Sequence, residues 1–244
     1  MLSKSQIKHL RSLAQLKFRR EFRQFLAEGP KILGELPGSG IRVEAVYGLR
    51  NWIEENNATL ERLKTEIVPI NSNELGRISS LSSPNHVVAL CQIPSREISD
   101  MDDEGLILAL DGIRDPGNLG TIIRTADWFG ILSIICSNDC VDLYNPKTIQ
   151  ATMGSFTRVQ VYYTDLPEYL SNCDQDIFAT VMDGDPIWDV KTGKGIYIIG
   201  NESNGIRPEV LQHASRKVSI PARGTAESLN AALAAGIVMA IATR

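Results

Sequence analysis

Short, uninterrupted apolar runs recur from residue 105 to the end of the chain. They lie at 106–110, 131–136, 177–182, 196–199 and 218–220. Such runs are typical of strands that are buried on both faces of a parallel sheet. Helices are predicted after several of them, at 119–129, 165–172, 208–215 and 228–242. The alternation predicts an α/β domain with a mostly parallel sheet covered by helices on both faces.

The first 95 residues predict a second, smaller α/β domain. Its opening helix is indicated by the apolar spacing of Ile7, Leu10, Ala14, Phe18, Phe22 and Phe25. After another helical stretch up to Leu36, strands are predicted at 42–47, 67–70 and 86–93, with a polar helix at 54–64. The polar, acidic stretch 96–104 shows no periodic element. We therefore expect two domains, 1–95 and 105–244, joined by a linker at 96–104.

The composition limits the class of protein. The chain contains 43% hydrophobic and 22% charged residues, which is ordinary for a globular protein and excludes disordered, collagenous and coiled-coil chains. No apolar run approaches the ~18 residues of a membrane span, so no membrane association is expected. The four cysteines form no Cys-x-x-Cys pair and the histidines stand far from them, which predicts reduced thiols and no metal site. Residues 1–20 lack acidic residues, as a mitochondrial presequence does, but their helical spacing indicates part of the fold and a cytoplasmic protein.

The charge is unevenly distributed along the chain. The net charge of −4 by itself argues against a nucleic-acid binder. Residues 1–31, however, carry eight basic and two acidic side chains, whereas residues 99–244 carry 11 basic and 19 acidic ones. A basic N-terminal segment on an acidic body indicates that one lobe meets an anionic partner. The alternative is a solvated helix face.

Ligands of parallel sheets bind beyond the carboxyl ends of the strands, so the loops after the predicted strands are the candidate functional segments. The loop 111–120 is rich in Gly and Pro and leads into a helix, where backbone N–H groups suit an anion. Arg124 in that helix could form a fork to phosphate or ribose oxygens. Alternatively, Asn118 caps the helix and Arg124 extends to solvent.

Two later loops have related features. Residues 200–206 place four polar residues between two glycines, which predicts a ligand site, a helix cap or a plain turn before Pro208. In the loop 220–230, Ser228 is placed to cap an Ala-rich helix. The small residues of that helix predict either a close crossing within the chain or a subunit interface; they are Ala231, Ala232, Ala234, Ala235 and Gly236.

Several common site motifs are missing from the sequence. There is no Gly-x-x-x-x-Gly-Lys-Ser/Thr loop and no Gly-x-Gly-x-x-Gly after a strand, which disfavours P-loop and ordinary Rossmann proteins. There is no Gly-x-Ser-x-Gly elbow, and no His stands in the three loops, which disfavours a hydrolase triad. A small-molecule nucleotide enzyme of another α/β class is disfavoured by the missing phosphate loop.

The three loops resemble the signatures of a known family. Residues 110–126, LDGIRDPGNLGTIIRTA, resemble the first signature of the SpoU/TrmH RNA 2′-O-ribose methyltransferases. Residues 199–206, IGNESNGI, resemble the second, and Ile220-Pro221 with 228–232, SLNAA, resemble the third. The resemblance extends more loosely to 25–31, FLAEGPK, which is similar to the RNA-binding appendage of the family.

The resemblance implies a parallel-sheet domain with a C-terminal trefoil knot, a homodimer, and S-adenosylmethionine as methyl donor. The implied reaction is in-line transfer of the sulfonium methyl group to a ribose 2′-hydroxyl of RNA. The appended N-terminal domain favours ribosomal RNA over transfer RNA by analogy. The alternatives are a tRNA 2′-O-methyltransferase and a non-catalytic RNA-binding protein of the same fold.

The resemblance also implies roles for particular residues. Arg124 is closest to the reacting hydroxyl; because Arg keeps its proton in proteins, we expect it to bind an adjacent phosphate and stabilise oxyanion character. Asn118 is expected to position ribose or Arg124, and Glu202 to orient Arg124 or accept a proton. Ser228 and Asn230 are expected to fix the geometry of the site. Cofactor contacts are expected from Thr180, Met182, Gly200, Ile220 and Leu229.

The sequence departs from the family at two positions. Relatives usually carry Arg and Ser where this chain has Gln150 and Thr152. The loss of that Arg predicts altered RNA contacts or substrate choice, while the three signatures stay intact.

Overall fold

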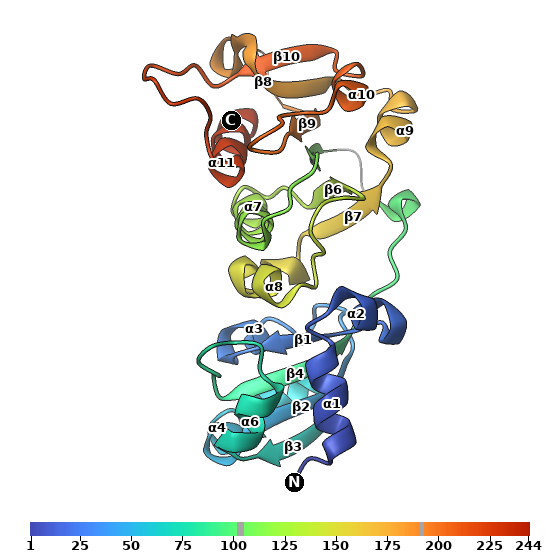
Figure 1. Ribbon diagram of the computed structural model, residues 1–244, viewed down its shortest axis with the longest axis vertical. Coiled ribbons are helices and arrows are strands. Elements are labelled where there is room, and N and C mark those ends of the chain that lie inside the picture. Colours follow the sequence, from blue (N-terminus) through green and yellow to red (C-terminus); the bar gives the residue numbers. More distant parts are fainter. Residues whose placement is uncertain (102–104, 191–192) are drawn as a thin grey trace. The chain divides into compact units, whose positions relative to one another are not determined.

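The computed structural model describes residues 1–101, 105–190 and 193–244, so the end of the predicted linker, 102–104, lies outside the described residues. The chain forms two compact units (Figure 1). The units are Met1–Ser95 with Asp142–Thr157, and Arg96–Val141 with Arg158–Arg244. The limits 1–95 and 105–244 stay a proposal for the functional domains.

The first unit is built on a four-stranded sheet with the order β1-β4-β2-β3. β2 and β3 are parallel, and the other neighbouring pairs are antiparallel. The strands are β1 (Gln24–Glu28), β2 (Val43–Leu49), β3 (Glu66–Ile70) and β4 (Val87–Gln92). The helices are α1 (Lys4–Ser12), α2 (Leu16–Phe22), α3 (Pro30–Gly34), α4 (Arg50–Glu55), α5 (Asn57–Leu63), α6 (Ser72–Ile78) and α8 (Pro146–Thr152). Its core includes Leu10 of α1, Ile78 of α6 and Tyr47 and Val88 of the sheet.

The prediction of one opening helix through Phe25 is wrong. α1 ends at Ser12 and α2 at Phe22, and Arg23 then adopts a left-handed backbone conformation with φ of 53° that ends the helix. Phe25 lies fully buried in β1, and this strand was not predicted because Phe25 fits the helical spacing of the preceding apolar residues. The predicted polar helix 54–64 is likewise divided, between α4 and α5.

The segment 142–157 belongs to the first unit through specific contacts. Asp142 forms an ion pair with the buried Arg19 at 2.7 Å. Gln150 Nε2 donates a hydrogen bond to the backbone oxygen of Glu28 in β1 at 2.8 Å. Thr152 is fully buried, and its hydroxyl donates to a backbone oxygen of its own helix, α8. The two residues that depart from the family pattern are therefore held by contacts within this unit.

The second unit is built on a six-stranded sheet with the order β10-β8-β9-β5-β6-β7, in which every neighbouring pair is parallel. The strands are β5 (Leu106–Leu110), β6 (Ser133–Ser137), β7 (Gln160–Thr164), β8 (Ile177–Pro186), β9 (Gly195–Ile199) and β10 (Arg216–Ser219). The apolar runs predicted all of these strands except β7, whose ends are polar. The α/β class with a mostly parallel sheet is confirmed, and the knot stays a prediction.

Helices cover both faces of this sheet (Figure 1). They are α7 (Pro116–Trp128), α9 (Leu166–Ser171), α10 (Pro208–Leu211) and α11 (Ala231–Ala242), with 3-10 turns η1 (Ile98–Asp100) and η3 (Ile187–Asp189); η2 (Ser155–Thr157) lies in the first unit. On one face, Ile107 and Ile196 pack with Leu170 of α9 and Val210 of α10. On the other, α11 packs against α7 and β9. The sheet is therefore a buried layer whose functional loops emerge at strand ends.

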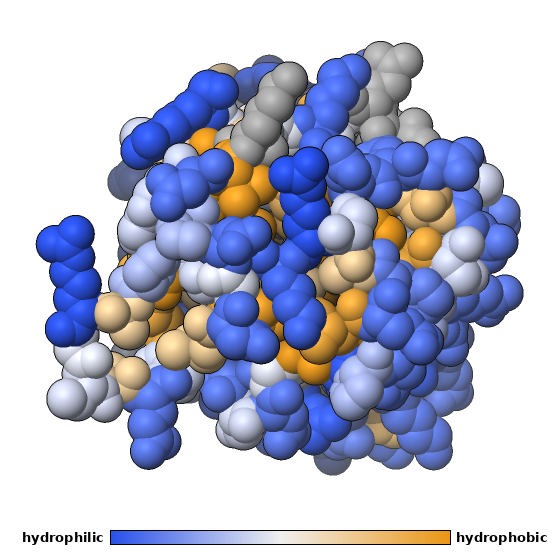
Figure 2. All heavy atoms as spheres, turned by 90° about the horizontal axis from the view of Figure 1, so that it is seen from above, coloured by the Kyte–Doolittle hydropathy of each residue, from blue (hydrophilic) through white to orange (hydrophobic). Residues whose placement is uncertain are grey.

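One face of the second unit is mostly polar (Figure 2). The face that lies uppermost in Figure 1 is largely hydrophilic, and hydrophobic atoms are visible mainly between the charged and polar side chains (Figure 2). Within the described part of the chain, no helix combines the length and apolar character that a bilayer span requires.

Candidate active site

A cavity of about 520 Å³ lies in the second unit, between β8 and the loops that follow β9 and β10. The loop after β9 contributes residues 199–206, and the loop after β10 contributes most of 220–231. The cavity brings together all five predicted cofactor contacts: Thr180, Met182, Gly200, Ile220 and Leu229. Glu202 and Ser228 also line it. Two segments that are distant in sequence therefore form one recess beside β8.

The loop after β9 is a tight turn closed by its own hydrogen bonds. Asn201 and Gly205 exchange backbone hydrogen bonds of 3.0 and 2.9 Å. The side-chain oxygen of Asn201 accepts from the N–H groups of Ser203 and Asn204 at 2.9 and 3.3 Å. A Cβ atom at Gly200 would lie 2.3 Å from the carbonyl carbon of Gly205, so only glycine fits this position. The polar run between the two glycines thus holds the wall of the cavity in shape.

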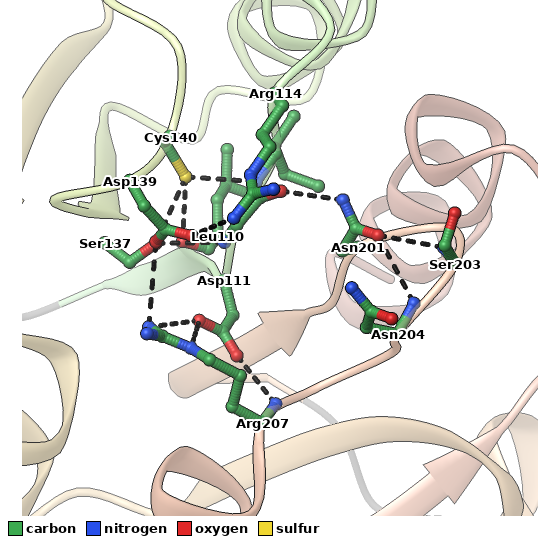
Figure 3. A network of polar contacts seen from close by, with 12 residues as sticks. Leu110, Asp111, Arg114, Ser137, Asp139, Cys140, Asn201, Ser203, Asn204 and Arg207 are labelled. Carbon is green, nitrogen blue, oxygen red and sulfur yellow. Dashed lines mark hydrogen bonds and ion pairs between the residues drawn. The ribbon is translucent and has the colours of Figure 1, made fainter.

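The same loop is fastened to the end of β5 on both sides (Figure 3). Asn201 Nδ2 donates to the backbone oxygen of Gly112 at 2.8 Å. At the other end, the Arg207 guanidinium and backbone N–H both bind the buried Asp111 carboxylate, with contacts of 2.6 to 2.8 Å. A buried carboxylate requires such partners to offset its desolvation. Sequence reasoning missed Asn201, Asp111 and Arg207 as structural anchors, although two of them lie within the signatures.

A second group of contacts holds the loop after β5 against the end of β6 (Figure 3). The Ser137 hydroxyl bonds the N–H of Gly112 at 2.9 Å and an oxygen of Asp139 at 2.7 Å. The hydrogen bond from Ser137 lowers the pKa of Asp139, with further lowering by Arg114 and Arg207. Asp139 is therefore an anion that compensates the positive charge of both arginines.

Asn118 links the first signature to the other two. Its side-chain N–H donates to a Glu202 carboxylate oxygen, and its side-chain oxygen accepts from Asn230 Nδ2 at 3.0 Å. The alternative in which Asn118 caps α7 is wrong, because the cap is Asp115, which accepts from the Asn118 N–H at 2.8 Å. The side chain of Asn118 is thereby left available for Glu202 and Asn230.

The predicted cap of the last helix is also corrected. α11 begins at Ala231, and its cap is Asn230, whose side-chain oxygen accepts from the N–H groups of Ala232 and Leu233 at 3.0 and 3.3 Å. Ser228 precedes this cap and lines the cavity instead. Asn230 therefore has two functions, because its oxygen begins α11 while its amide nitrogen contacts Asn118.

Arg124 lies apart from this hydrogen-bonded chain. It is exposed on α7, and its side chain has no hydrogen bond or ion pair with any described residue. The predicted contact of Glu202 with Arg124 is not present, since the hydrogen bond of Glu202 is made with Asn118. α7 itself is held against α11, where a Cβ at Gly236 would lie 3.7 Å from a methyl group of Thr125. The small residues of α11 thus serve a crossing within the chain.

The cavity fits a cationic nucleoside cofactor such as S-adenosylmethionine. The Thr180 hydroxyl is buried beside the cavity and has no hydrogen-bond partner among the described residues. Exposed apolar surface is offered by Met182 and Leu229, and the carboxylates of Glu202 and Glu227 line the recess. Apolar walls with a few polar groups are typical of cofactor sites, and the carboxylates complement a sulfonium charge. In the described ranges, no three His, Cys, Asp or Glu residues cluster as metal ligands.

Two families of known proteins match this chain, one over most of the second unit and one over most of the first. Residues 105–240 match the model of the SpoU rRNA Methylase family, and residues 4–89 match an MRM3-like substrate binding domain. The chain is 27% identical to the 23S rRNA (guanosine(2553)-2′-O)-methyltransferase RlmP of Bacillus subtilis, over 96% of this chain and 94% of the relative. It is 31% identical to an uncharacterized tRNA/rRNA methyltransferase of Synechocystis, over 98% of this chain and 90% of the relative.

A solved structure shows the same likeness. The AdoMet-bound rRNA methyltransferase of Sinorhizobium meliloti superposes with a TM-score of 0.88 and 28% identity, covering 99% of this chain and 96% of that one. The family model spans more than half of this chain and includes the three loops described above. The resemblance stated from the sequence is confirmed. This chain belongs to the SpoU rRNA Methylase family.

Proposed function

We infer that this protein is an S-adenosylmethionine-dependent methyltransferase that acts on a ribose 2′-hydroxyl of RNA. The observation that carries this conclusion is the convergence of three separated loops. Two of them line one cavity, and Asn118 of the third bonds Glu202 in its wall. Relatives named as 23S rRNA and tRNA/rRNA methyltransferases align over nearly the whole chain, which supports ribosomal RNA as the substrate and leaves transfer RNA as the alternative.

Within the cavity, each lining group has a role that follows from its chemistry. The nucleoside would be held by the backbone around Gly200, Ile220 and Leu229 and by the Thr180 hydroxyl, which bonds none of the described residues, with Met182 as apolar surface. When bound, the cofactor supplies a methyl group on a sulfonium centre. The protein contributes a shaped wall, because the 200–206 turn is closed by its own backbone hydrogen bonds.

The reaction forms a bond between the methyl carbon and the ribose oxygen while the bond from sulfur to that carbon breaks. The hydroxyl proton must leave as the new bond forms. We assign its acceptance to the Glu202 carboxylate, which Asn118 holds in place together with Asn230. Arginine is always charged in proteins, and the Arg124 guanidinium is exposed without an ion pair to any described residue, which suits an RNA phosphate and the developing negative charge on oxygen. Ser228 supports the geometry of the cavity rim.

We also propose a homodimer and a cytoplasmic location. Trp128 at the end of α7 and Leu233 in α11 are 85% and 55% exposed, which supplies apolar surface on two helices that pack together. Exposed apolar side chains mark an association surface where they form one contiguous patch, and the proposed dimer would join these two helices. The basic segment 1–31 is proposed to contact RNA phosphates, so that RNA affinity should fall steeply with salt.

The function is tested with purified protein and with cells. Calorimetry should register binding of S-adenosylmethionine, and a labelled methyl group should pass to RNA from a deletion strain. Mapping 2′-O-methyl groups in that strain should reveal one lost position in ribosomal RNA. A lost position in transfer RNA would select the alternative substrate. RNA binding without any cofactor uptake would refute the enzyme and favour the non-catalytic protein of the same fold.

A further inference from the structure

The first unit has a recess of its own, far in sequence from the cofactor cavity. It has a volume of about 490 Å³ and runs along α1 and the start of α2, with one residue from α6. We call it the α1 groove. Its lining residues are Lys4, Ile7, Lys8, Arg11, Ser12, Gln15, Phe18 and Arg77.

The charges of the α1 groove are of one sign. Four of its lining residues are basic and none is acidic. Lys4, Lys8 and Arg11 follow each other at helical spacing on one face of α1, over roughly 10 Å of helix. Arg77 joins them from α6. Like charges at this spacing repel each other, so the α1 groove favours a ligand that carries several negative charges.

The basic side chains of the α1 groove differ from Arg19 in their pairing. In the described ranges, none of the four basic residues of the α1 groove takes part in an ion pair. Glu74, on the same helix as Arg77, accepts hydrogen bonds from the backbone N–H groups of Leu2 and Asn71, and these bonds are the main cause that lowers its pKa, with a smaller lowering by the charge of Arg77. Arg19, by contrast, is buried in its pair with Asp142. The α1 groove therefore differs from the site of Arg19, because its four cations form no ion pair within the described ranges.

An aromatic ring stands at one end of the α1 groove. Phe18 lies parallel to Phe22, with ring centroids 6.1 Å apart and planes 9° apart, and the exposed Lys17 places its Nζ 5.7 Å from the Phe18 centroid, where a stacked base would displace it. His9 meets Phe22 edge-on at 4.6 Å and bonds Gln24 at 2.7 Å, so the rings are held in position. A fixed ring beside free cations is the combination that binds single-stranded nucleic acid, because a base stacks on the ring while the phosphates pair with the cations.

We propose that the α1 groove binds an unpaired stretch of RNA, with phosphates on Lys4, Lys8, Arg11 and Arg77 and one base stacked on Phe18. The identification of the polyanion as RNA rests on the proposed function. The choice of an unpaired strand rests on Phe18, because the bases of a duplex are stacked on each other and unavailable to a side chain. Gln15, exposed in the lining, is placed to contact a base edge.

The proposal is tested by fluorescence anisotropy with the full chain and a labelled 12-nucleotide oligouridine, over a series of salt concentrations. Lys8→Gln with Arg77→Gln should weaken binding at least tenfold in low salt. It should also reduce the slope of log affinity against log salt by about 1.4, since each lost phosphate contact on a single strand removes about 0.7. Phe18→Ala should weaken binding about 5- to 100-fold with an unchanged slope, because stacking is not an ionic contact.

The controls distinguish RNA binding by the α1 groove from a general effect of positive charge and from the binding of the cofactor. Arg50→Gln with Arg62→Gln removes two exposed cations elsewhere in the first unit and should change affinity less than twofold. All variants should bind S-adenosylmethionine like the parent chain, and circular dichroism should show the native fold. An equal loss in the control pair, an unaffected Phe18→Ala variant, or equal binding of a 12-base-pair RNA duplex would overturn the proposal. Failure of cofactor binding in the parent chain would instead overturn the proposed function.

Discussion

Arg207 binds Asp111 through both its main chain and its side chain. Its backbone N–H donates to one carboxylate oxygen at 2.8 Å, and its Nε donates to the other at 2.8 Å. Asp111 directly follows β5, and Arg207 precedes α10. The loop 200–206 lies between Arg207 and β9, so this contact anchors one end of the cavity wall to the centre of the sheet.

Removal of the Arg207 side chain should lower the free energy of unfolding by more than is usual for a partly exposed ion pair. Arg207→Ala leaves Asp111 buried with one backbone N–H, and we expect a loss of about 3 kcal/mol in the free energy of unfolding together with weaker cofactor binding. Arg114→Ala is the matched control, because its pair with Asp139 is exposed and should be worth less than about 1 kcal/mol. Urea denaturation and cofactor titration of both variants measure the difference. Equal losses would contradict an anchoring role for Asp111.

A single methyl group at Gly200 should abolish cofactor binding. The added Cβ would lie 2.3 Å from the backbone of Gly205, so the turn must open and the cavity wall must move. Gly224→Ala provides the control within the third loop, since nothing lies within 4 Å of its Cβ position. Calorimetry with S-adenosylmethionine should show at least a tenfold loss for the first variant and no change for the second. Unchanged binding by Gly200→Ala would show that the turn is not rigid.

The two functions of Asn230 can be separated by substitution. Asn230→Ser retains a side-chain oxygen that can cap α11 but loses the Nδ2 contact with Asn118. We expect it to unfold like the parent chain while its kcat falls at least tenfold. Asn230→Ala loses both contacts and should also lose about 1 kcal/mol of stability. Denaturation midpoints and methyl-transfer rates test this, and full activity of the serine variant would remove the Asn118 contact from the mechanism.

The sequence predicted the parallel sheet and its loops because buried strands leave continuous apolar runs. It missed β1, since Phe25 continues a helical spacing although the left-handed Arg23 ends the helix before it. It placed the residues of the cofactor cavity together, because loops after neighbouring parallel strands meet at one edge. It did not predict the Asn118–Glu202 contact, since hydrogen bonds between distant loops have no periodicity in the sequence.

Arg124 should be required for methyl transfer and dispensable for everything else. It is exposed and unpaired within the described residues, so Arg124→Ala should change the free energy of unfolding by less than about 0.5 kcal/mol. Cofactor affinity should be unchanged, while methylation should be lost. Arg124→Lys retains the positive charge but cannot make the two parallel hydrogen bonds of a guanidinium, so it should recover only part of the methylation rate. Retained activity of the alanine variant would exclude Arg124 from the reaction.

The thiol of Cys140 makes stability depend on pH. A hydrogen bond from Cys136 is the main cause that lowers the pKa of Cys140 to about 7, with further contributions from Ser137 and the Ile113 N–H. A thiol in the unfolded chain has a higher pKa, so between about pH 7 and 9 the unfolded chain binds more protons and stability rises with pH. The stabilisation that Cys140 contributes is lost as the pH falls through 7. Burial raises the pKa of Cys136 itself, so its opposite effect on stability begins as pH passes the ordinary thiol pKa of about 8.5.

Urea denaturation in reducing buffer measures this dependence. Between pH 7 and 8 the free energy of unfolding should rise by about 1 kcal/mol more in the parent chain than in Cys140→Ser. Cys136→Ala should also flatten the curve, because Cys140 then loses its main hydrogen-bond donor. Cys173→Ser, outside this network, should leave the curve unchanged. If the parent chain and Cys140→Ser show the same pH dependence, Cys140 is not ionised near neutrality and the hydrogen bonds around it favour the protonated thiol.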